Sequence, residues 1–233
     1  MSQKVLVAGT GISGISAAKL LLAQGGEVVL YDGNEKLSEE KLKAKFDEGA
    51  KVTIVLGELK KTDLMGVELC VISPGIPLEA PFVAVIDEAK IPIWSEIELA
   101  YHCSKGKLAA ITGTNGKTTT TSLTAKMLNA GGVSAVAAGN IGPNAVTELT
   151  EHDKAGTLPD AWVLELSSFQ LQTTESLFCD AAAITNVTED HIDWHGNFDA
   201  YLNAKRRILK PETLAVLNRE DPLSAGSALP GEK

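Results

Sequence analysis

The sequence predicts an α/β protein built from two successive doubly wound domains, and three observations carry this prediction. Short apolar runs alternate with helix-like segments along the chain, aromatic residues make up only 5% of the composition, and a strand, glycine loop and helix follow one another twice. With few aromatic side chains, the core must be built from Val, Leu, Ile and Ala. Such a core suits buried parallel strands covered by helices.

The first part of the chain predicts one complete domain. Apolar runs predict strands at residues 4–8, 28–31, 51–56, 69–73 and 91–94. Apolar periodicity or charge patterning predicts helices at residues 15–22, 35–48 and 81–89. This alternation places the first domain at residues 1–94.

The pattern restarts after a predicted linking helix at residues 95–104. Strands are predicted at residues 108–112, 133–138, 161–165, 181–186 and 214–218, with helices from the second glycine loop to residue 129 and at residues 201–209. Residues 148–158 are polar and end in a loop. The tail, residues 224–233, is rich in Ser, Gly, Ala and Pro, which favours an unfinished loop.

The charge balance excludes two classes of partner. The chain has 21 Lys and Arg against 30 Asp and Glu, so its formal net charge is −9. A negative field repels nucleic acid and anionic membranes, so we expect small-molecule partners, with no nucleic acid and no membrane. Because it also repels nucleotides, any phosphate site must use local backbone N–H groups, lysines and metal ions.

Cysteine usage and the N-terminal sequence favour a cytoplasmic protein. Cys70, Cys103 and Cys179 are scattered, and their spacing fits neither a disulfide framework nor a zinc site. We therefore expect buried thiols in a reducing compartment. The N-terminus enters a predicted strand without a signal-peptide pattern, and no apolar run reaches the roughly 18 residues of a membrane span.

The first glycine loop, residues 9–14, reads Gly-Thr-Gly-Ile-Ser-Gly between a predicted strand and helix. Glycines there allow a tight turn and let a diphosphate approach the backbone at a helix N-terminus. Asp32 lies close to the expected spacing of a ribose-binding acid. The pattern predicts a Rossmann-like domain and leaves NAD, FAD and a UDP-sugar open as ligands, alongside a turn that binds nothing.

The second glycine loop is a stronger signal. Residues 113–119 read Gly-Thr-Asn-Gly-Lys-Thr-Thr, again between a strand and a helix, which predicts a P-loop ATPase-type domain. Backbone N–H groups would cradle phosphates, Lys117 would neutralise their charge, and the Thr118 hydroxyl would reach Mg²⁺. The first glycine is two residues closer to Gly116 than in the general pattern, so the loop is tighter. A chance Gly-Lys-Thr turn is the alternative.

Acidic residues and a histidine follow two later strands. Glu165 ends one strand, where a carboxylate is placed to hold Mg²⁺ or simply to face solvent. Residues 186–193 follow another strand and contain His191, a candidate metal ligand through its neutral imidazole. We interpret His195 as a surface residue.

Lys205 begins a run of three cations on a predicted helix. Tyr201, Lys205 and Ile208 share one helix face at i, i+4, i+7 spacing, so this lysine lies on the side of the apolar residues. A solvated charged face is the alternative. From the residues alone, only charge neutralisation explains an inward lysine.

In combination, these motifs resemble the Mur ligases of peptidoglycan synthesis. Besides the two glycine loops, the resemblance rests on Ser73-Pro-Gly-Ile-Pro77, Gly139-Asn-Ile-Gly142, Leu164-Glu-Leu-Ser-Ser-Phe-Gln170, Asn186-Val-Thr-Glu-Asp-His191 and Ala204-Lys-Arg-Arg-Ile208. The first and third segments resemble the branch that adds D-glutamate to UDP-N-acetylmuramoyl-L-alanine. The resemblance covers nearly the whole chain and implies an ATP-dependent amide ligase that works through an acyl phosphate.

The resemblance also implies a role for each matching position. The UDP substrate would be held by Gly11, Ile12, Ser13, Gly14, Asp32, Ser73, Pro74, Gly75, Asn140 and Ser167. ATP would lie on Gly113, Thr114, Asn115, Gly116, Lys117, Thr118 and Thr119. One Mg²⁺ would use Thr118 and Glu165, and a second would use His191 and a carbamylated Lys205, with Lys117, His191 and Lys205 as catalytic residues. After Asp32 the sequence reads Gly33-Asn34, which leaves the uracil contacts unassigned.

Length is the main departure from the family, which has three domains. We expect residues 1–94 to bind the UDP substrate and residues 95–233 to form an incomplete ATP-binding domain. The C-terminal domain that binds the amino acid is expected to be absent. We expect this chain to be a monomeric fragment that binds UDP-N-acetylmuramoyl-L-alanine but does not ligate D-glutamate.

Three other interpretations remain open from the sequence. One is another Mur ligase or a folylpolyglutamate synthase-like enzyme. A nicotinamide-dependent oxidoreductase would explain the first glycine loop but leaves Lys117 and Thr118 without a role. The third is a nucleotide-binding module that performs no chemistry.

Overall fold

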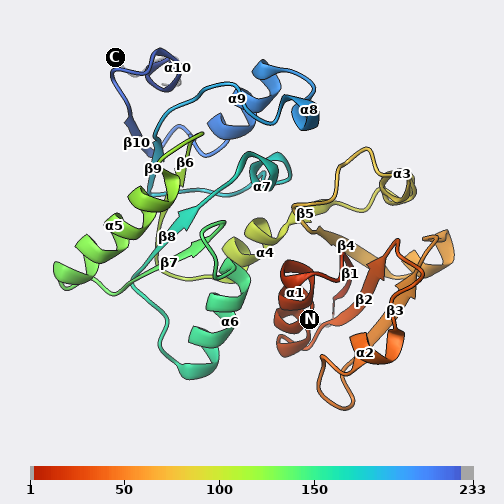
Figure 1. Cartoon of the computed structure of the whole chain (residues 1–233). Helices are drawn as coiled ribbons and strands as arrows, with labels where there is room; N and C mark the ends of the chain where they lie inside the picture. Colours follow the sequence, from red (N-terminus) through yellow and green to blue (C-terminus); the bar gives the residue numbers. More distant parts are fainter. Residues whose placement is uncertain (1–2, 227–233) are drawn as a thin grey trace. The chain divides into compact units, whose positions relative to one another are not determined.

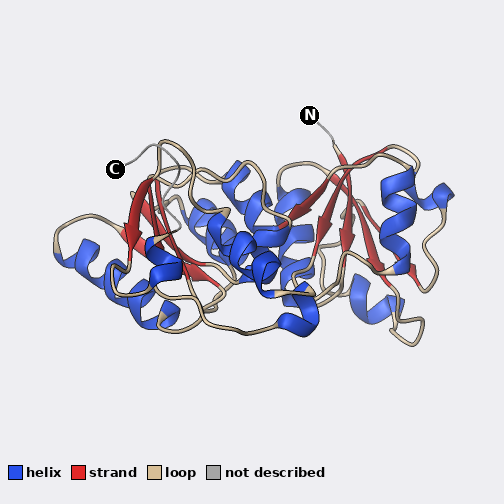
Figure 2. Cartoon of the chain, turned by 90° about the horizontal axis from the view of Figure 1, so that it is seen from above, coloured by secondary structure: helices blue, strands red, loops and turns tan. Residues whose placement is uncertain are grey.

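The computed structural model of the chain describes residues 3–226 and divides into two compact units between Leu99 and Ala100. Each unit contains one five-stranded parallel sheet (Figure 1). Figure 2 shows the two sets of strands separately, each flanked by helices. The predicted fold class, two α/β domains with parallel sheets, is therefore confirmed, while the boundary after residue 94 stays a prediction.

The first unit has the sheet order β3-β2-β1-β4-β5. Its elements are β1 (Lys4–Ala8), α1 (Ile12–Ala23), β2 (Glu27–Asp32), α2 (Glu39–Lys43), β3 (Val52–Leu56), the 3₁₀ helix η1 (Lys61–Leu64), β4 (Val67–Ile72), α3 (Pro81–Glu88), β5 (Ile93–Ser95) and α4 (Glu96–Cys103), which crosses the division between the units. The central strand β1 pairs with β2 and β4, so their carboxyl ends meet at one edge.

The second unit has the sheet order β10-β9-β6-β8-β7. Its elements are β6 (Lys107–Thr112), α5 (Lys117–Ala130), β7 (Ala135–Gly139), α6 (Ala145–Ala155), β8 (Ala161–Glu165), α7 (Ser168–Gln172), β9 (Ala181–Ile184), α8 (Ile192–His195), α9 (Phe198–Arg206), β10 (Leu214–Leu217) and α10 (Pro222–Ala225). Here β6 is central and pairs with β8 and β9, which again brings three strand ends together.

The cores follow the composition. In the first unit, Leu6, Val29 and Ile72 of neighbouring strands pack against Ile86 of α3 and are at most 2% exposed. Because both faces of the sheet are covered, the central strand is a continuous apolar run rather than an alternating one. In the second unit, Val163 is fully buried within a cluster of mostly small side chains beneath α5.

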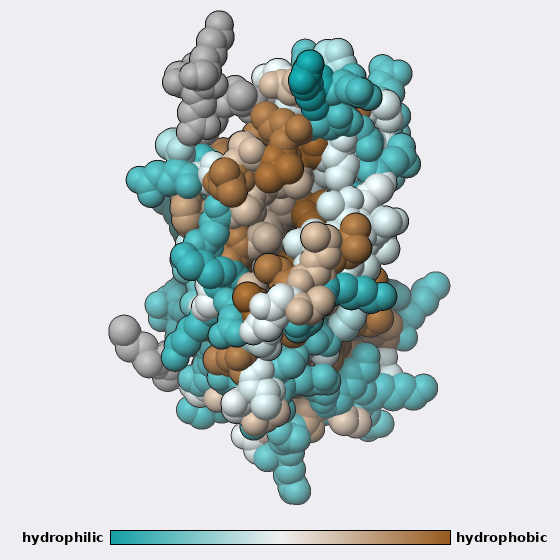
Figure 3. Space-filling view, turned by 90° about the vertical axis from the view of Figure 1, so that its left-hand side faces the viewer, coloured by the Kyte–Doolittle hydropathy of each residue, from teal (hydrophilic) through white to brown (hydrophobic). Residues whose placement is uncertain are grey.

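Strand β10 at the sheet edge is less covered. Leu214 and Val216 are 67% and 55% exposed, and on α5 Leu123 and Met127 are also exposed. Figure 3 shows apolar side chains open to solvent on the side of the molecule that lies at the left of Figure 1. Among residues 3–226, no helix is both long and apolar enough to cross a lipid bilayer.

One local prediction was wrong. Of the helix predicted at residues 35–48, only Glu39–Lys43 forms, because Leu42 is the single buried residue of that helix and provides no apolar stripe to pack. The polar segment at residues 148–158 ends in a loop as predicted, and its first part belongs to α6, since Asn144 caps that helix and Val146 and Leu149 bury one face. In the segment at residues 224–233, residues 224 and 225 belong to α10, and residues 227–233 lie outside the described residues.

Candidate phosphate-binding loops and reaction pocket

The first glycine loop joins β1 to α1 at the carboxyl edge of the sheet. Gly9 has φ +103°, which favours glycine, and a Cβ on Gly14 would lie 1.9 Å from the Gly9 carbonyl oxygen. Helix α1 begins at Ile12 without a side-chain cap on Gly11. The N-terminus of α1, the end of a helix that favours anions, therefore lies at this edge of the sheet.

Asp32, at the end of β2, holds this loop in place. Its Oδ2 accepts hydrogen bonds from the Thr10 hydroxyl at 2.6 Å and from the Thr10 N–H at 3.1 Å. Its Oδ1 accepts the N–H of Asn34 at 3.0 Å. Both carboxylate oxygens are thus engaged by the chain itself, and Asp32 fixes the position of Thr10 within the loop.

A cavity of about 500 Å³ opens beside the loop. Its walls combine backbone-rich turns with two aromatic rings and one carboxylate, and they are formed by residues 9–13, Tyr31, Asp32, Gly33, residues 73–76 and Phe82. The buried Ser73 hydroxyl has no hydrogen-bond partner within residues 3–226. No lysine or arginine is among the described residues that line this cavity, so the donors that it could offer to a phosphate are backbone N–H groups.

The second glycine loop joins β6 to α5. A Cβ on Gly113, whose φ is +146°, would lie 2.0 Å from the Thr185 hydroxyl, and Gly116 begins α5 in the left-handed conformation. The segment after β9 holds the loop from the other side, because Asn186 accepts the N–H groups of Thr114 and Asn115 at 2.9 Å each. The tight spacing seen in the sequence is thus stabilised by a neighbouring strand end.

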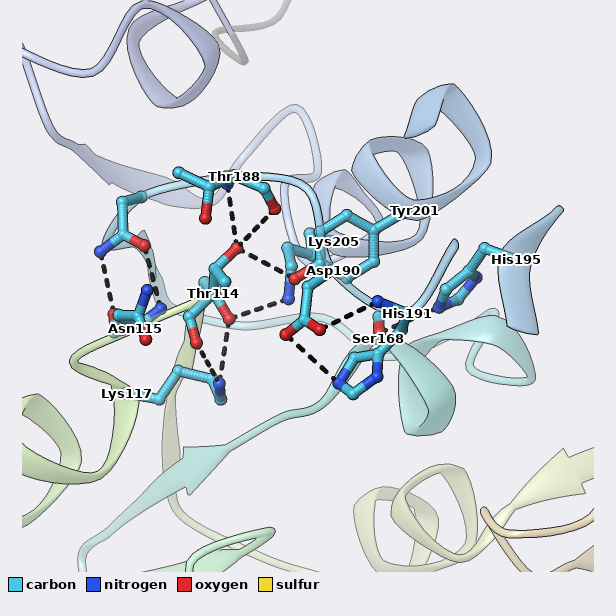
Figure 4. Close-up of polar contacts among 12 residues, drawn as sticks. Thr114, Asn115, Lys117, Ser168, Thr188, Asp190, His191, His195, Tyr201 and Lys205 are labelled. Carbon is cyan, nitrogen blue, oxygen red and sulfur yellow. Dashed lines mark hydrogen bonds and ion pairs between the residues drawn. The ribbon is translucent and has the colours of Figure 1, made fainter. Parts of the chain in front are cut away.

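Two lysines converge on this loop. Lys117 Nζ donates to the carbonyls of Gly113 and Thr114 at 3.0 and 2.9 Å, and Lys205 Nζ donates to the same Gly113 carbonyl at 2.8 Å (Figure 4). Lys205 is only 2% exposed, and its Nζ lies 4.4 Å from the centre of the Tyr201 ring. Burial, reinforced by the charge of Lys117, lowers the pKa of Lys205 to about 7, against the partial opposition of Asp190.

A polar pocket of about 110 Å³ lies next to the two lysines. It brings together five predicted site residues, Lys117, Asn140, Ser167, His191 and Lys205. Four further lining residues were not predicted, namely Ser168, Phe169, Asp190 and Tyr201. The sequence offers a signal for Tyr201, because it lies one helical turn before Lys205 on the same face. In the structure its hydroxyl lies 3.0 Å from that of Thr114.

Of the four predicted metal ligands, two line the pocket and two are not among its described lining residues. His191 and Lys205 line the pocket, whereas Thr118 lies exposed in the first turn of α5 and Glu165 lies at the end of β8. Glu165 is 1% exposed, and its Oε1 accepts the side-chain N–H of Asn140 at 2.8 Å. Its buried Oε2 has no hydrogen-bond partner within residues 3–226, which fits a carboxylate that awaits a cation.

Within residues 3–226, no three His, Cys, Asp or Glu side chains gather as a ready metal site. Mg²⁺ commonly keeps several waters and uses one or two carboxylates together with substrate phosphates. The buried Oε2 of Glu165, which has no hydrogen-bond partner within residues 3–226, is compatible with that mode of binding.

Other predictions had mixed outcomes. His195 is half-buried rather than a surface residue, because it stacks on Phe169 at 5.7 Å between ring centres and its Nε2 lies 3.0 Å from the Ser168 hydroxyl. Burial, with the charges of Lys205 and His191, lowers the pKa of His195. None of the three cysteines forms a disulfide within residues 3–226, and Cys70 and Cys179 are buried while Cys103 is half-buried.

Family comparisons match both units. The family model described as "Mur ligase MurD-like, N-terminal domain" matches residues 3–95, and that described as "Mur ligase middle domain" matches residues 111–229. Both matches fall on the glycine loops described above. The second alone covers half of the chain.

Curated relatives are UDP-N-acetylmuramoylalanine–D-glutamate ligases. The chain is 43% identical over 224 residues to the protein of Lachnospira eligens, covering 94% of this chain and 48% of the relative. It is 45% identical over 230 residues to that of Ralstonia nicotianae, covering 93% and 46%. The chain therefore spans about half the length of the curated relatives that it matches.

Solved structures share the fold. A murein peptide ligase of Psychrobacter arcticus superposes with a TM-score of 0.56 at 17% identity, covering 97% of this chain and 51% of that one. A UDP-N-acetylmuramate:L-alanyl-gamma-D-glutamyl-meso-diaminopimelate ligase of Neisseria meningitides gives a TM-score of 0.59 at 17% identity, covering 97% and 74%.

Proposed function

The chain belongs to the Mur ligase family, and from this premise we propose that it carries the UDP-substrate and ATP sites of a UDP-N-acetylmuramoylalanine–D-glutamate ligase. The observation that carries the proposal is the meeting of Lys117 and Lys205 at the Gly113 carbonyl. This carbonyl lies beside the polar pocket of about 110 Å³, which we call the reaction pocket. In a chain of net charge −9, two cations at one loop are placed to bring anionic groups together.

We assign the UDP substrate to the first glycine loop and its cavity. Gly11 to Gly14 would meet the diphosphate with backbone N–H groups, and Ser73, Pro74 and Gly75 border the same cavity. Asp32 fixes Thr10 within the loop. Asn140 and Ser167 line the reaction pocket of the second unit, where the reacting carboxylate of the substrate would lie.

We assign ATP to the second glycine loop, residues 113–119. The backbone N–H groups of the loop and Lys117 would hold the phosphates, and Thr118 and Glu165 would hold Mg²⁺, which supplies charge neutralisation between ATP and the substrate carboxylate. The carboxylate attacks the γ-phosphorus, ADP leaves, and an acyl phosphate forms. The amine of D-glutamate then attacks the acyl carbon, phosphate leaves, and the amide remains after the amine loses a proton.

Lys205 has a second proposed state. A neutral amine is needed to attack CO₂, and the burial that lowers the pKa of Lys205 to about 7 makes that form accessible near neutral pH. The product carbamate is an anion, which together with His191 would favour a second Mg²⁺ in the reaction pocket. The number of Mg²⁺ ions, a monomeric state and a cytoplasmic location remain predictions.

Calorimetry tests this assignment. We expect the chain to bind UDP-N-acetylmuramoyl-L-alanine through the first glycine loop and its cavity, and MgATP through the second loop. Absence of UDP-substrate binding by a chain whose spectra show it folded would contradict the proposal, and tight NADH binding would favour an oxidoreductase.

A further inference from the structure

A second cavity of about 250 Å³ is lined by a different face of helix α9 from the one that lines the reaction pocket. Ala200, Asn203, Ala204 and Arg207 follow one another at i, i+3, i+4, i+7 spacing and form one wall, and Gln172 and His195 close it from the ends of α7 and α8. The two cavities share no lining residue. None of the roles assigned above uses this second cavity.

Its polar side chains present hydrogen-bond donors. Arg207 is anchored by its Nε, which donates to the Thr174 carbonyl at 3.1 Å. Within residues 3–226 its terminal guanidinium nitrogens have no hydrogen-bond partner, and these nitrogens are the donors that a ligand would meet. Gln172 is anchored through Oε1, which accepts the Trp194 indole N–H at 3.0 Å, so its remaining polar group is an NH₂. Asn203 adds a second carboxamide from an exposed position on α9.

His195 completes the donor set. Its Nε2 lies 3.0 Å from the Ser168 hydroxyl, which fixes the ring edge on the side of the reaction pocket. When the hydroxyl donates to Nε2, the other ring nitrogen, Nδ1, carries the hydrogen and is a donor. The described residues that line the cavity include no Asp or Glu, although the chain as a whole carries 30 of them.

From this arrangement we propose that the cavity bounded by Gln172, His195, Asn203 and Arg207 is a binding site for a small oxyanion, either a carboxylate or a phosphate. A planar guanidinium held at its Nε offers two parallel N–H groups, the geometry that both anions accept. The site communicates with the reaction pocket through one hydrogen bond, because Ser168 lines that pocket and is bonded to His195 (Figure 4).

The test uses nuclear magnetic resonance of the whole chain. The chain has three tryptophans, so its spectrum has three indole N–H signals, and Trp194→Phe assigns the one that is bonded to Gln172. Inorganic phosphate and succinate are titrated separately, each in a Lys117→Ala background, so that phosphate on the second glycine loop does not contribute. A saturable shift of the Trp194 signal with either anion is expected, and the anion that saturates first identifies the ligand class.

Two variants and a matched control make the test specific. Arg207→Gln should weaken binding by at least about tenfold, while Arg206→Gln removes the same charge from the neighbouring residue and should leave binding within about twofold. Asn203→Asp introduces a carboxylate at an exposed position, where folding is not at risk, and should abolish binding by repulsion.

Two results would overturn the proposed oxyanion site. Absence of saturation by both anions up to about 50 mM, a range that reaches affinities far below those of specific sites, would overturn the proposal. Equal losses in Arg207→Gln and Arg206→Gln would also overturn it, because they would indicate attraction to general positive charge rather than a built site.

Discussion

The two glycine loops of this chain share a backbone plan and differ in charge. Both leave the central strand of a parallel sheet and enter a helix, and both need glycine where a Cβ would strike a neighbouring oxygen. The first faces a cavity of about 500 Å³ whose described lining includes no cation. The second faces about 110 Å³ with Lys117 and Lys205 in its wall.

This difference distinguishes a site that only binds a phosphate from a site at which a phosphoryl group is transferred. Helix N-termini and backbone N–H groups suffice to bind a diphosphate that stays intact. Transfer of a phosphoryl group to a carboxylate brings two anions together, and this requires mobile or buried cations. The first loop accordingly uses an acid, Asp32, as an internal brace, whereas the second loop is braced by the uncharged Asn186.

The largest effect is expected when a glycine that both loops require for their backbone geometry is replaced. Gly14→Ala would place Cβ 1.9 Å from the Gly9 carbonyl oxygen, so we expect a loss of about 3 kcal/mol or more in the free energy of unfolding of the first unit, measured by urea denaturation. Gly11→Ala is the control, because no atom lies within 4 Å of its Cβ and its φ is −71°. Equal stability of the two variants would show that the loop is not packed as described.

A smaller effect is expected from the brace of the first loop. Asp32→Asn replaces one acceptor oxygen by an NH₂, which breaks a charge-assisted bond to Thr10, and we expect about tenfold weaker binding of the UDP substrate. Thr10→Val removes the hydroxyl bond and keeps the N–H bond, so its loss should be smaller. If Thr10→Val were the more damaging change, Asp32 would not be acting through the loop.

The pH dependence of Lys205 tests the role of the cations at the second glycine loop. Burial lowers its pKa from 10.5 to about 7, so the reactive neutral amine rises from about a tenth at pH 6 to about nine-tenths at pH 8. Carbamate formation from ¹³C-labelled bicarbonate, followed by carbon resonance, should increase over that window once the CO₂ concentration is held constant.

The same shift has a consequence for stability. Protonating a buried lysine costs folding free energy, and this cost is complete below pH 7 and disappears as pH rises toward 10.5. Lys205→Arg, which stays charged, is the control for both measurements and should give no carbamate at any pH. Carbamate formation that is independent of pH between 6 and 8 would contradict the lowered pKa.

Local sequence patterns predicted the parts that depend on neighbours in the chain. Both loops, the helix that carries Lys205 and its inward face follow from glycine spacing and apolar periodicity. The contact of Lys205 with Gly113 joins residues 92 positions apart, and no local pattern encodes it. The same holds for His195, whose burial is produced by Phe169 from another helix.

Calorimetry of the Lys117→Ala variant with MgATP and with UDP-N-acetylmuramoyl-L-alanine tests most directly the claim that the two loops are separate sites with different charge requirements. Lys126→Ala is the matched control, since it removes an exposed lysine from the same helix. We predict that Lys117→Ala lowers the affinity for MgATP by about a hundredfold and leaves that for the UDP substrate unchanged, while the control alters neither. Equal loss of both ligands in Lys117→Ala, or the loss of neither, would contradict the account.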